Sequence, residues 1–300
     1  MRTDRPVRRR KWGGTSAGPV ALLVAALLVI WYAGAVYLNS PMLIDRYQKS
    51  AANWSAARLV TDSWSMERPV LPAPHQIARE LKRSILERSI TSRRSLVYHA
   101  GVTLSSAMSG FVIGALLGIA LAIGIVHVAT LERSLMPWII ASQTIPILAI
   151  APMIIVVLGA VGVTGLLPKA VISAYLCFFP VTVGMVKGLR SPSKNLLDLM
   201  RNYNASDAQT LWKLRLPASV PYLFASLKIA VALSLVGAIV AELPAGAQAG
   251  LGARLLSGSY YGQTNLIWAA LITASVVSAS LVALVGRVER GATRRMGLQP

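Results

Sequence analysis

The sequence is poor in charged residues, cysteine and histidine, and each shortage excludes a class of protein. Only 14% of the 300 residues are charged, whereas about a quarter are charged in a typical soluble domain, and 55% are hydrophobic. The lone cysteine, Cys177, lies in an apolar run, so no disulfide framework or cysteine metal site is expected. The three histidines lie far apart and show no metal-ligand spacing. These shortages predict a polytopic membrane protein without a metal site.

Acidic residues are also scarce: the chain has 11 Asp and Glu and 30 Lys and Arg, which gives a formal net charge of +19. Such a basic chain could bind nucleic acid, but no base-recognition motif accompanies the charge. The basic residues instead collect between apolar runs, as expected where membrane proteins meet anionic headgroups. The chain also lacks the phosphate-binding loop G-x-x-x-x-G-K-[ST], so we expect it not to hydrolyse ATP itself.

Long uncharged segments predict about six membrane-spanning helices. A hydrocarbon core about 30 Å thick needs about 20 apolar residues in a helix. Gly110, Gly114 and Gly118 recur every fourth residue in one segment, which predicts close packing against a neighbouring helix. The predicted spans cover residues 19–38, about 25 residues within 100–131, and residues 136–160, 168–187, 222–243 and 265–286.

The first predicted span has an alternative interpretation as a cleaved signal peptide. Basic residues precede it, and the run Ala-Gly-Ala at 33–35 resembles a cleavage site. The uncharged run is longer than the usual signal-peptide core of about 7–15 residues, which favours a retained helix.

Lys and Arg in the short flanking segments predict the orientation. The N-terminal tail has six, the 187–220 segment has six, and the tail after residue 286 has four. These segments share one side of a six-span topology, so both termini and the 187–220 segment are expected in the cytoplasm. Residues 39–98 carry ten basic residues and would lie outside, but that segment is about 60 residues long, where the rule stops applying.

The polar segment 188–220 predicts a helical hairpin between two spans. Ser191 and Pro192 are typical of a helix start, and Asn204 tolerates the left-handed conformation that often ends a helix. Four apolar residues lie between them at the spacing of one helix face, which favours docking into a partner's groove. They are Leu196, Leu199, Met200 and Tyr203.

A second helix is predicted directly after the turn. Ser206 and Gln209 form a capping-box pattern, and Pro217 is expected to end the helix. Leu211, Trp212 and Leu214 supply its apolar positions.

This hairpin resembles the cytoplasmic loop of permease subunits in binding-protein-dependent ABC importers. That loop carries the pattern E-A-A-x3-G-x9-I-x-L-P, and this sequence reads D-L-M-x3-N-x9-L-x-L-P at the same spacing. Only the final Leu-Pro is identical, and Met200 is bulkier than the alanine it replaces. The resemblance assigns the contact with an ATPase to Asp198, Leu199, Met200, Arg201, Asn204, Ala205, Ser206, Leu214, Leu216 and Pro217.

Further segments resemble the nitrate, sulfonate and taurine branch of these permeases, over roughly residues 95–290. They are S-Q-T-I-P-I-L-A-I-A-P at 142–152, Y-N-A-S at 203–206, L-P-A-S-V-P-Y-L-F-A-S-L-K-I-A at 216–230 and V-A-E-L at 240–243. The resemblance implies an all-α membrane protein with the type I importer fold. It also implies a solute pathway between two permease subunits, in a homodimer or a heterodimer, within a bacterial inner membrane.

The implied partners are ABC ATPase subunits, which use ATP, and a periplasmic binding protein, which delivers the solute; this chain would bind no cofactor. The predicted solute is a small oxyanion such as nitrate, an alkanesulfonate or taurine, and a pyrimidine-type thiamin precursor stays open. The predicted parts are a basic tail 1–18, a first helix 19–38, a periplasmic segment 39–98, a permease core 99–290 with the coupling loop 188–220, and a cytoplasmic tail 291–300.

Four residues are candidates for the solute pathway. Gln143, Thr144 and Pro146 lie in a proline-interrupted span, where a kink could move between states, although ordinary kinked-helix packing would use the same residues. Glu242 lies near the end of a span, and ionisable residues there usually face a cavity or the protein interior. Pairing with a neighbouring helix, or a place among the headgroups, is the alternative for Glu242.

Two other classes of function compete with the importer permease. A self-contained secondary transporter would need no ATPase, but it would favour internal repeats, and none is evident. A membrane-embedded enzyme would need His, Asp, Glu or Cys clustered at membrane depth, and Glu242 with a lone Cys177 does not make such a cluster.

Overall fold

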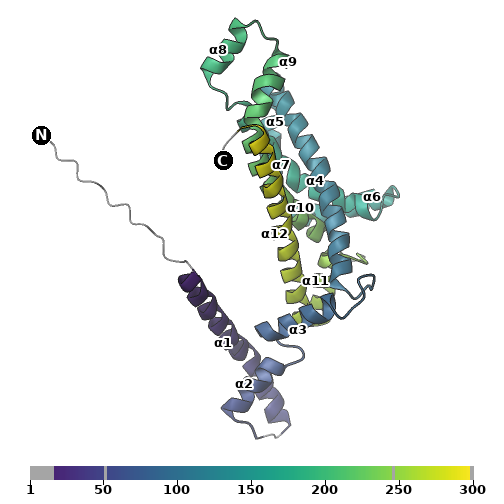
Figure 1. Cartoon of the computed structure of the whole chain (residues 1–300). Coiled ribbons are helices and arrows are strands. Elements are labelled where there is room, and N and C mark those ends of the chain that lie inside the picture. The colour runs from purple at the N-terminus through teal and green to yellow at the C-terminus, as the bar shows by residue number, and fades with distance from the viewer. Residues whose placement is uncertain (1–16, 51–52, 245–246, 298–300) are drawn as a thin grey trace, which may run out of the picture. The chain divides into compact units, whose positions relative to one another are not determined.

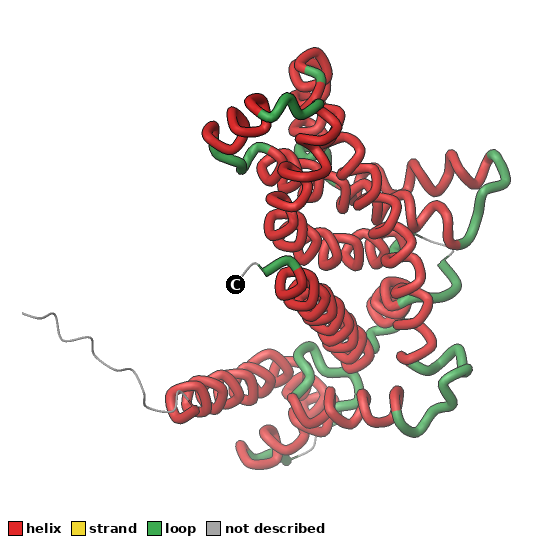
Figure 2. The backbone as a smooth tube through the Cα atoms, turned by 45° about the horizontal axis from the view of Figure 1, so that its top comes forward, coloured by secondary structure: helices red, strands yellow, loops and turns green. Residues whose placement is uncertain are grey.

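The computed structural model describes residues 17–50, 53–244 and 247–297, and the regular elements within these ranges are all helices (Figures 1 and 2). The chain divides into two compact units, residues 1–78 and 79–300. Within these described ranges, five helices are long and apolar enough to cross a membrane, or six if one bent pair forms a single span. The prediction of an all-α protein with about six spans is therefore confirmed.

The first unit contains α1 (Ala17–Lys49), α2 (Ala56–Ser65) and the start of α3 (Pro74–Ile85). α1 continues beyond the predicted span 19–38 because Ala35, Leu43 and Tyr47 recur at multiples of four residues and are buried within the unit. Asn39 shares this stripe, and its buried amide accepts from the Val70 N–H at 2.7 Å and donates to backbone oxygens of the 63–71 segment.

The second unit is built around α4 (Leu96–His127), α7 (Leu166–Leu189) and α10 (Leu216–Ala241), with α12 (Thr264–Arg295) packed on α10. The predicted glycine stripe faces α7: a Cβ atom added to Gly114 would lie 2.8 Å from the Ala174 carbonyl oxygen. The packing role of the stripe is therefore confirmed. Cys177 is fully buried in this contact, as expected for a small apolar residue.

The predicted single helix over 136–160 is wrong. The chain instead forms α5 (Ala129–Ser142) and α6 (Ile147–Ala160), which are bent by 101° relative to each other. Pro146 explains the break, because proline cannot donate a helical hydrogen bond and disfavours helical geometry in the residue before it. Pro146 itself has an extended backbone, with φ −63° and ψ 118°.

α11 (Leu251–Tyr260) lies between the predicted spans 222–243 and 265–286, where no helix was predicted. Its first residue packs in a cluster with Leu96 of α4 and Leu266 of α12. Leu81 and Ile85 of α3 pack against the same cluster.

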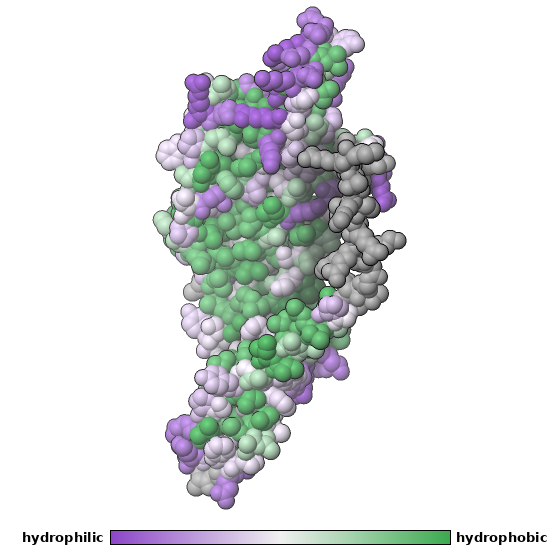
Figure 3. Space-filling view, turned by 90° about the vertical axis from the view of Figure 1, so that its left-hand side faces the viewer, coloured by the Kyte–Doolittle hydropathy of each residue, from purple (hydrophilic) through white to green (hydrophobic). Residues whose placement is uncertain are grey.

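A surface that is largely apolar covers the side of the second unit seen in Figure 3, below hydrophilic side chains at the top of the view. α8 (Lys194–Asn202) and α9 (Asp207–Thr210) lie at that end in Figure 1, and α11 lies at the opposite end. We call these the hairpin end and the far end of the second unit.

Candidate functional site

The hairpin consists of α8, a turn at Asn204 and α9, as the sequence predicted. Asn204 has φ 50°, and it is the single non-glycine residue with positive φ among the described residues. The predicted start is two residues early, because Ser193 rather than Ser191 is the N-cap of α8. The Ser191 hydroxyl instead donates to the Gly188 carbonyl at 2.7 Å, which closes the end of α7.

The capping box of the second helix is confirmed. The Gln209 N–H donates to the Ser206 hydroxyl at 3.2 Å, and the Ser206 N–H donates to the Gln209 side chain at 2.9 Å. The prediction that Pro217 ends this helix is wrong. α9 continues through a π-helical turn (η1, Leu211–Arg215) directly into α10.

The π-helical turn has a physical cause in Pro217. Proline lacks the N–H that an α-helix needs, and its ring clashes with the carbonyl four residues earlier. A wider i→i+5 turn avoids this conflict, and the Leu216 N–H accordingly donates to the Leu211 carbonyl. Residues 207–241 therefore form one continuous helical segment from the hairpin to the far end.

Large apolar side chains of the hairpin are exposed. Leu199 is 48% exposed, Tyr203 78% and Trp212 70%. Charged side chains lie on another face of α8, where Arg201 pairs with Asp198 at 3.4 Å. The predicted contact residues lie on α8 (Asp198, Leu199, Met200, Arg201), in the turn (Asn204, Ala205, Ser206), in η1 (Leu214) and at the start of α10 (Leu216, Pro217).

The base of the hairpin is tied to the helices around it. Arg190, which directly follows α7, pairs with Glu132 of α5 at 2.7 Å, and this hydrogen bond raises the pKa of the Arg190 guanidinium. Arg215 donates to the Leu189 carbonyl at 3.1 Å, which joins η1 to the end of α7. A movement of the hairpin would therefore act on α5, α7 and α10 together.

Three of the predicted pathway residues lie at the bend between α5 and α6. Gln143, Thr144 and Pro146 are exposed, and the Thr144 hydroxyl donates to the Ala141 carbonyl at 2.7 Å. The Tyr175 hydroxyl of α7 donates to the Ser142 carbonyl, which holds the end of α5 against α7.

Glu242, the fourth candidate, lies at the far end of α10 and is fully buried. Its Oε2 atom accepts from the Thr103 hydroxyl at 2.8 Å and from the Gly252 N–H at 3.0 Å. Its Oε1 atom lies 3.6 Å from the Lys169 ammonium and accepts no hydrogen bond. One carboxylate thus joins α4, α7, α10 and α11, and none of its partners is one of the other three candidates.

Gly250 completes this cluster. Its φ of 124° is a backbone conformation that glycine adopts readily and other residues rarely adopt. A Cβ atom at this position would lie 2.0 Å from the Glu242 carboxyl carbon. Its N–H donates to His99 of α4 at 3.0 Å, and the next N–H, of Leu251, donates to Thr103 at 2.8 Å.

No spacing along the sequence connects Lys169, Thr103 or His99 with Glu242. The one local signal was Lys169, a basic residue on the side where short loops carry few of them. A lone Lys and a lone Glu near the ends of spans can be proposed as an ion pair from the sequence, because buried charges tend to be paired. The Thr103 hydroxyl and the His99 imidazole, which complete the cluster, carry no such signal.

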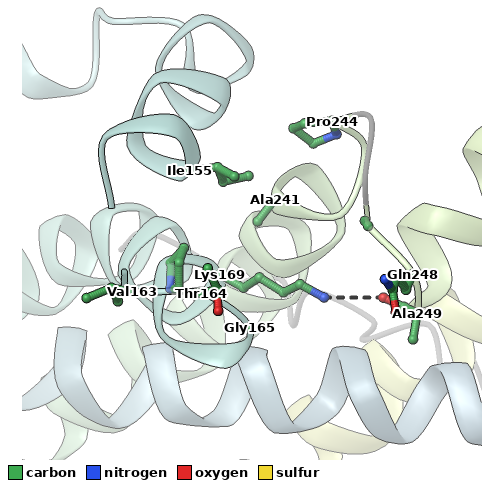
Figure 4. A pocket seen from close by; sticks show the side chains of 11 residues that line it. Ile155, Val163, Thr164, Gly165, Lys169, Ala241, Pro244, Gln248 and Ala249 are labelled. Atoms are coloured by element: carbon green, nitrogen blue, oxygen red, sulfur yellow. Dashed lines mark hydrogen bonds between the residues drawn. The ribbon is translucent and has the colours of Figure 1, made fainter. Parts of the chain in front are cut away.

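A pocket of about 570 Å³ lies beside this cluster at the far end (Figure 4). It lies between the α6–α7 connection, the end of α10 and the segment before α11. The Lys169 side chain crosses it, and its ammonium donates to the Ala249 carbonyl at 3.2 Å. The lining residues are Ile155, Val163, Thr164, Gly165, Pro168, Lys169, Ala241, Pro244, Ala247, Gln248 and Ala249.

Comparison with known proteins identifies the family. Residues 110–296 match the binding-protein-dependent transport system inner membrane component. The chain belongs to this family. The match covers the hairpin, the bend and the Lys169, Glu242 and Gly250 part of the far-end cluster, so the resemblance drawn from the hairpin motif is confirmed, together with the type I permease fold.

Relatives of this permease are other ABC transporter permeases. A probable ABC transporter permease of Haemophilus influenzae is 33% identical over 73% of this chain and 86% of its own length. The riboflavin transport system permease RibX of Chloroflexus aurantiacus is 30% identical over 95% and 92%. The formylaminopyrimidine transport permease ThiX of Halalkalibacterium halodurans is 30% identical over 63% and 73%.

Permeases named for the predicted solutes also match, at lower identity. They are a putative aliphatic sulfonates permease of Bacillus subtilis, at 28%, and a nitrate import permease of Leptolyngbya laminosa, at 26%. The permease is thus a multi-span membrane protein whose family consists of transport subunits, and the family implies ATPase and substrate-binding partners.

Proposed function

We propose that this permease forms the solute pathway of an ATP-driven importer and couples to a separate ATPase through the 191–217 loop. The observation that carries the proposal is the continuous helical segment 207–241. It begins in the second half of the hairpin and ends beside Glu242, so a displacement at one end reaches the other without crossing a flexible loop.

The exposed apolar residues of the hairpin support docking into a groove of the partner. Leu199, Tyr203 and Trp212 would be costly to leave in water, because each large apolar side chain gains about 1.5–3 kcal/mol from full burial. Leu196 and Leu199 lie on one face of α8, the arrangement that helices use when they bind in grooves.

The proposal includes the surroundings of the chain. The hairpin and both termini face the cytoplasm of a bacterium, as the basic residues of the hairpin segment and tails indicate, and the far end faces the periplasm. A second permease subunit, identical or different, completes the pathway, and a periplasmic binding protein delivers the solute. Membrane lipid surrounds the apolar helices, and the ATPase uses the ATP.

The solute is a small molecule, for which the sequence predicted an oxyanion such as nitrate, an alkanesulfonate or taurine. The relatives named for a sulfonate and for nitrate support that class. The relatives named for riboflavin and for a formylaminopyrimidine support the alternative of a small organic heterocycle, and they match at slightly higher identity.

Affinity purification from native membranes tests the coupling proposal. An ABC ATPase should co-purify with the permease and should be lost from the double variant Leu199→Asp, Tyr203→Asp, which places charges on the exposed apolar face. Lys194→Ala, an exposed position of the same helix, is the matched control and should retain the ATPase. An ATPase that stays bound to the double variant, or is absent from every preparation, would contradict the proposal.

A further inference from the structure

We propose that the far-end pocket beside Lys169 receives the transported solute and selects a neutral, polar organic molecule over an oxyanion. This inference rests on the importer function proposed above and adds the location of a solute site and the chemical class that it takes.

The pocket lies where a solute from outside would arrive. Its lining comes from the outer ends of α7 and α10, opposite the hairpin, and the exposed side chains of Thr164 and Gln248 lie on its wall. A second, smaller groove of about 220 Å³ shares Pro244 with it and runs between α6 and α10. That groove is lined by apolar residues, namely Leu148, Ala151, Pro152, Val240, Leu243 and Pro244.

The charge of the pocket is balanced before a solute binds. Lys169 is the one charged residue among the described lining residues, and its side chain is 16% exposed. The fully buried Glu242 carboxylate lies 3.6 Å behind its ammonium. An oxyanion on the open side of Lys169, at about 3 Å from the ammonium, would lie roughly twice as far from the carboxylate behind it, so the repulsion would offset about half of the attraction. The remaining attraction would offset less of the cost of removing the anion from water than an unpaired lysine would.

A neutral hydrogen-bond acceptor avoids this cost. A lysine ammonium has three donors, and here one reaches the Ala249 carbonyl while Glu242 lies beyond hydrogen-bond distance. A carbonyl or ring nitrogen can therefore accept from Lys169, and the Thr164 hydroxyl and the Gln248 amide on the wall offer further donors and acceptors.

The size and the remaining lining favour an organic molecule. Pockets that bind drug-sized molecules are about 300–1,000 Å³, and the volume of about 570 Å³ falls within that range. An ion the size of nitrate would occupy a small part of it. Ile155, Val163 and Pro168 add an apolar wall, against which a flat ring system would bury surface.

Protection from thiol labelling tests the site in the full complex with its ATPase and binding protein. Thr164→Cys and Gln248→Cys place thiols on the pocket wall, and Tyr260→Cys, at a 77% exposed position outside the lining, is the matched control. The native Cys177 is fully buried, so a maleimide should react at the introduced position. The probes are riboflavin, a formylaminopyrimidine, ethanesulfonate and nitrate, each added at the same concentration.

The proposal expects riboflavin or the formylaminopyrimidine to slow labelling at both pocket positions several-fold, with no effect at the control position. Protection by ethanesulfonate or nitrate would overturn the selected class. Unchanged labelling with all four probes, in a complex whose ATPase responds to its binding protein, would overturn the pocket as a solute site while the importer function stands. A complex without such ATPase activity would instead refute the proposed function.

A charge variant tests the balance directly. Glu242→Gln leaves the Lys169 ammonium without its counterion, so the pocket becomes positive and ethanesulfonate should now protect the Thr164→Cys thiol. If ethanesulfonate fails to protect a correctly assembled Glu242→Gln complex, charge balance does not govern selection and the inference is wrong.

Discussion

Gly250→Ala is expected to destabilise the permease far more than an alanine at an ordinary glycine. Gly250 combines φ 124° and ψ 164°, a region that essentially only glycine adopts, and alanine there costs about 1–3 kcal/mol. The added Cβ would also lie 2.0 Å from the Glu242 carboxyl carbon, so the buried carboxylate must move. Losing one of its hydrogen bonds, to Thr103 or Gly252, costs about 1.5–3 kcal/mol. The sum is about 2.5–6 kcal/mol.

Thermal unfolding of the purified complex, followed by tryptophan fluorescence, measures this loss. Gly262→Ala is the matched control, because Gly262 has φ 62° and no heavy atom within 4 Å of an added Cβ, so it should cost about 1–2 kcal/mol. In the double variant Gly250→Ala, Glu242→Ala the clash is gone, and the combined loss should be smaller than the sum of the single losses. Equal unfolding temperatures for Gly250→Ala and Gly262→Ala would refute the reasoning.

Three further predictions concern the helix packing and the hairpin. Gly114→Val should abolish folded, monodisperse protein in detergent, because the added Cβ would lie 2.8 Å from the α7 backbone. Gly101→Val, where an added Cβ has no neighbour within 4 Å, should purify normally, and similar yields of the two variants would contradict the packing. Asn204→Gly should keep ATP-driven uptake, and Asn204→Val should reduce it, because a β-branched residue at φ 50° costs about 1–2 kcal/mol; equal uptake would show that the turn is not needed. Arg190→Glu should uncouple ATP hydrolysis from uptake, and adding Glu132→Arg should restore coupling, with little change in stability because the pair is partly exposed. A double variant as impaired as the single one would refute this link.

Features encoded by neighbouring residues were predictable from the sequence. The Ser206–Gln209 capping box, the left-handed turn at Asn204 and the glycine stripe of α4 each depend on residue types at fixed short spacings. The spans 168–187 and 265–286 were also predicted, because long uncharged runs have few alternatives in a membrane.

Two kinds of feature were not predictable from the sequence: the backbone conformation that forms at a proline within a helical segment, and contacts between residues far apart in the chain. Pro146 and Pro217 both interrupt helical hydrogen bonding, yet one produces a bend of 101° and the other a π-helical turn inside a continuous helix. The cluster at Glu242 joins Thr103, Lys169 and Gly252, which are separated by up to 149 residues, so no spacing along the chain could reveal it.

Uptake into proteoliposomes tests the central claim most directly. The complex of permease, ATPase and binding protein is reconstituted with the solute that co-purifies with the binding protein, and uptake is measured with ATP and with a non-hydrolysable analogue. The account predicts uptake with ATP alone, and none by the permease without its ATPase under an imposed proton or sodium gradient. Gradient-driven uptake by the isolated permease would contradict the account and establish a secondary transporter instead.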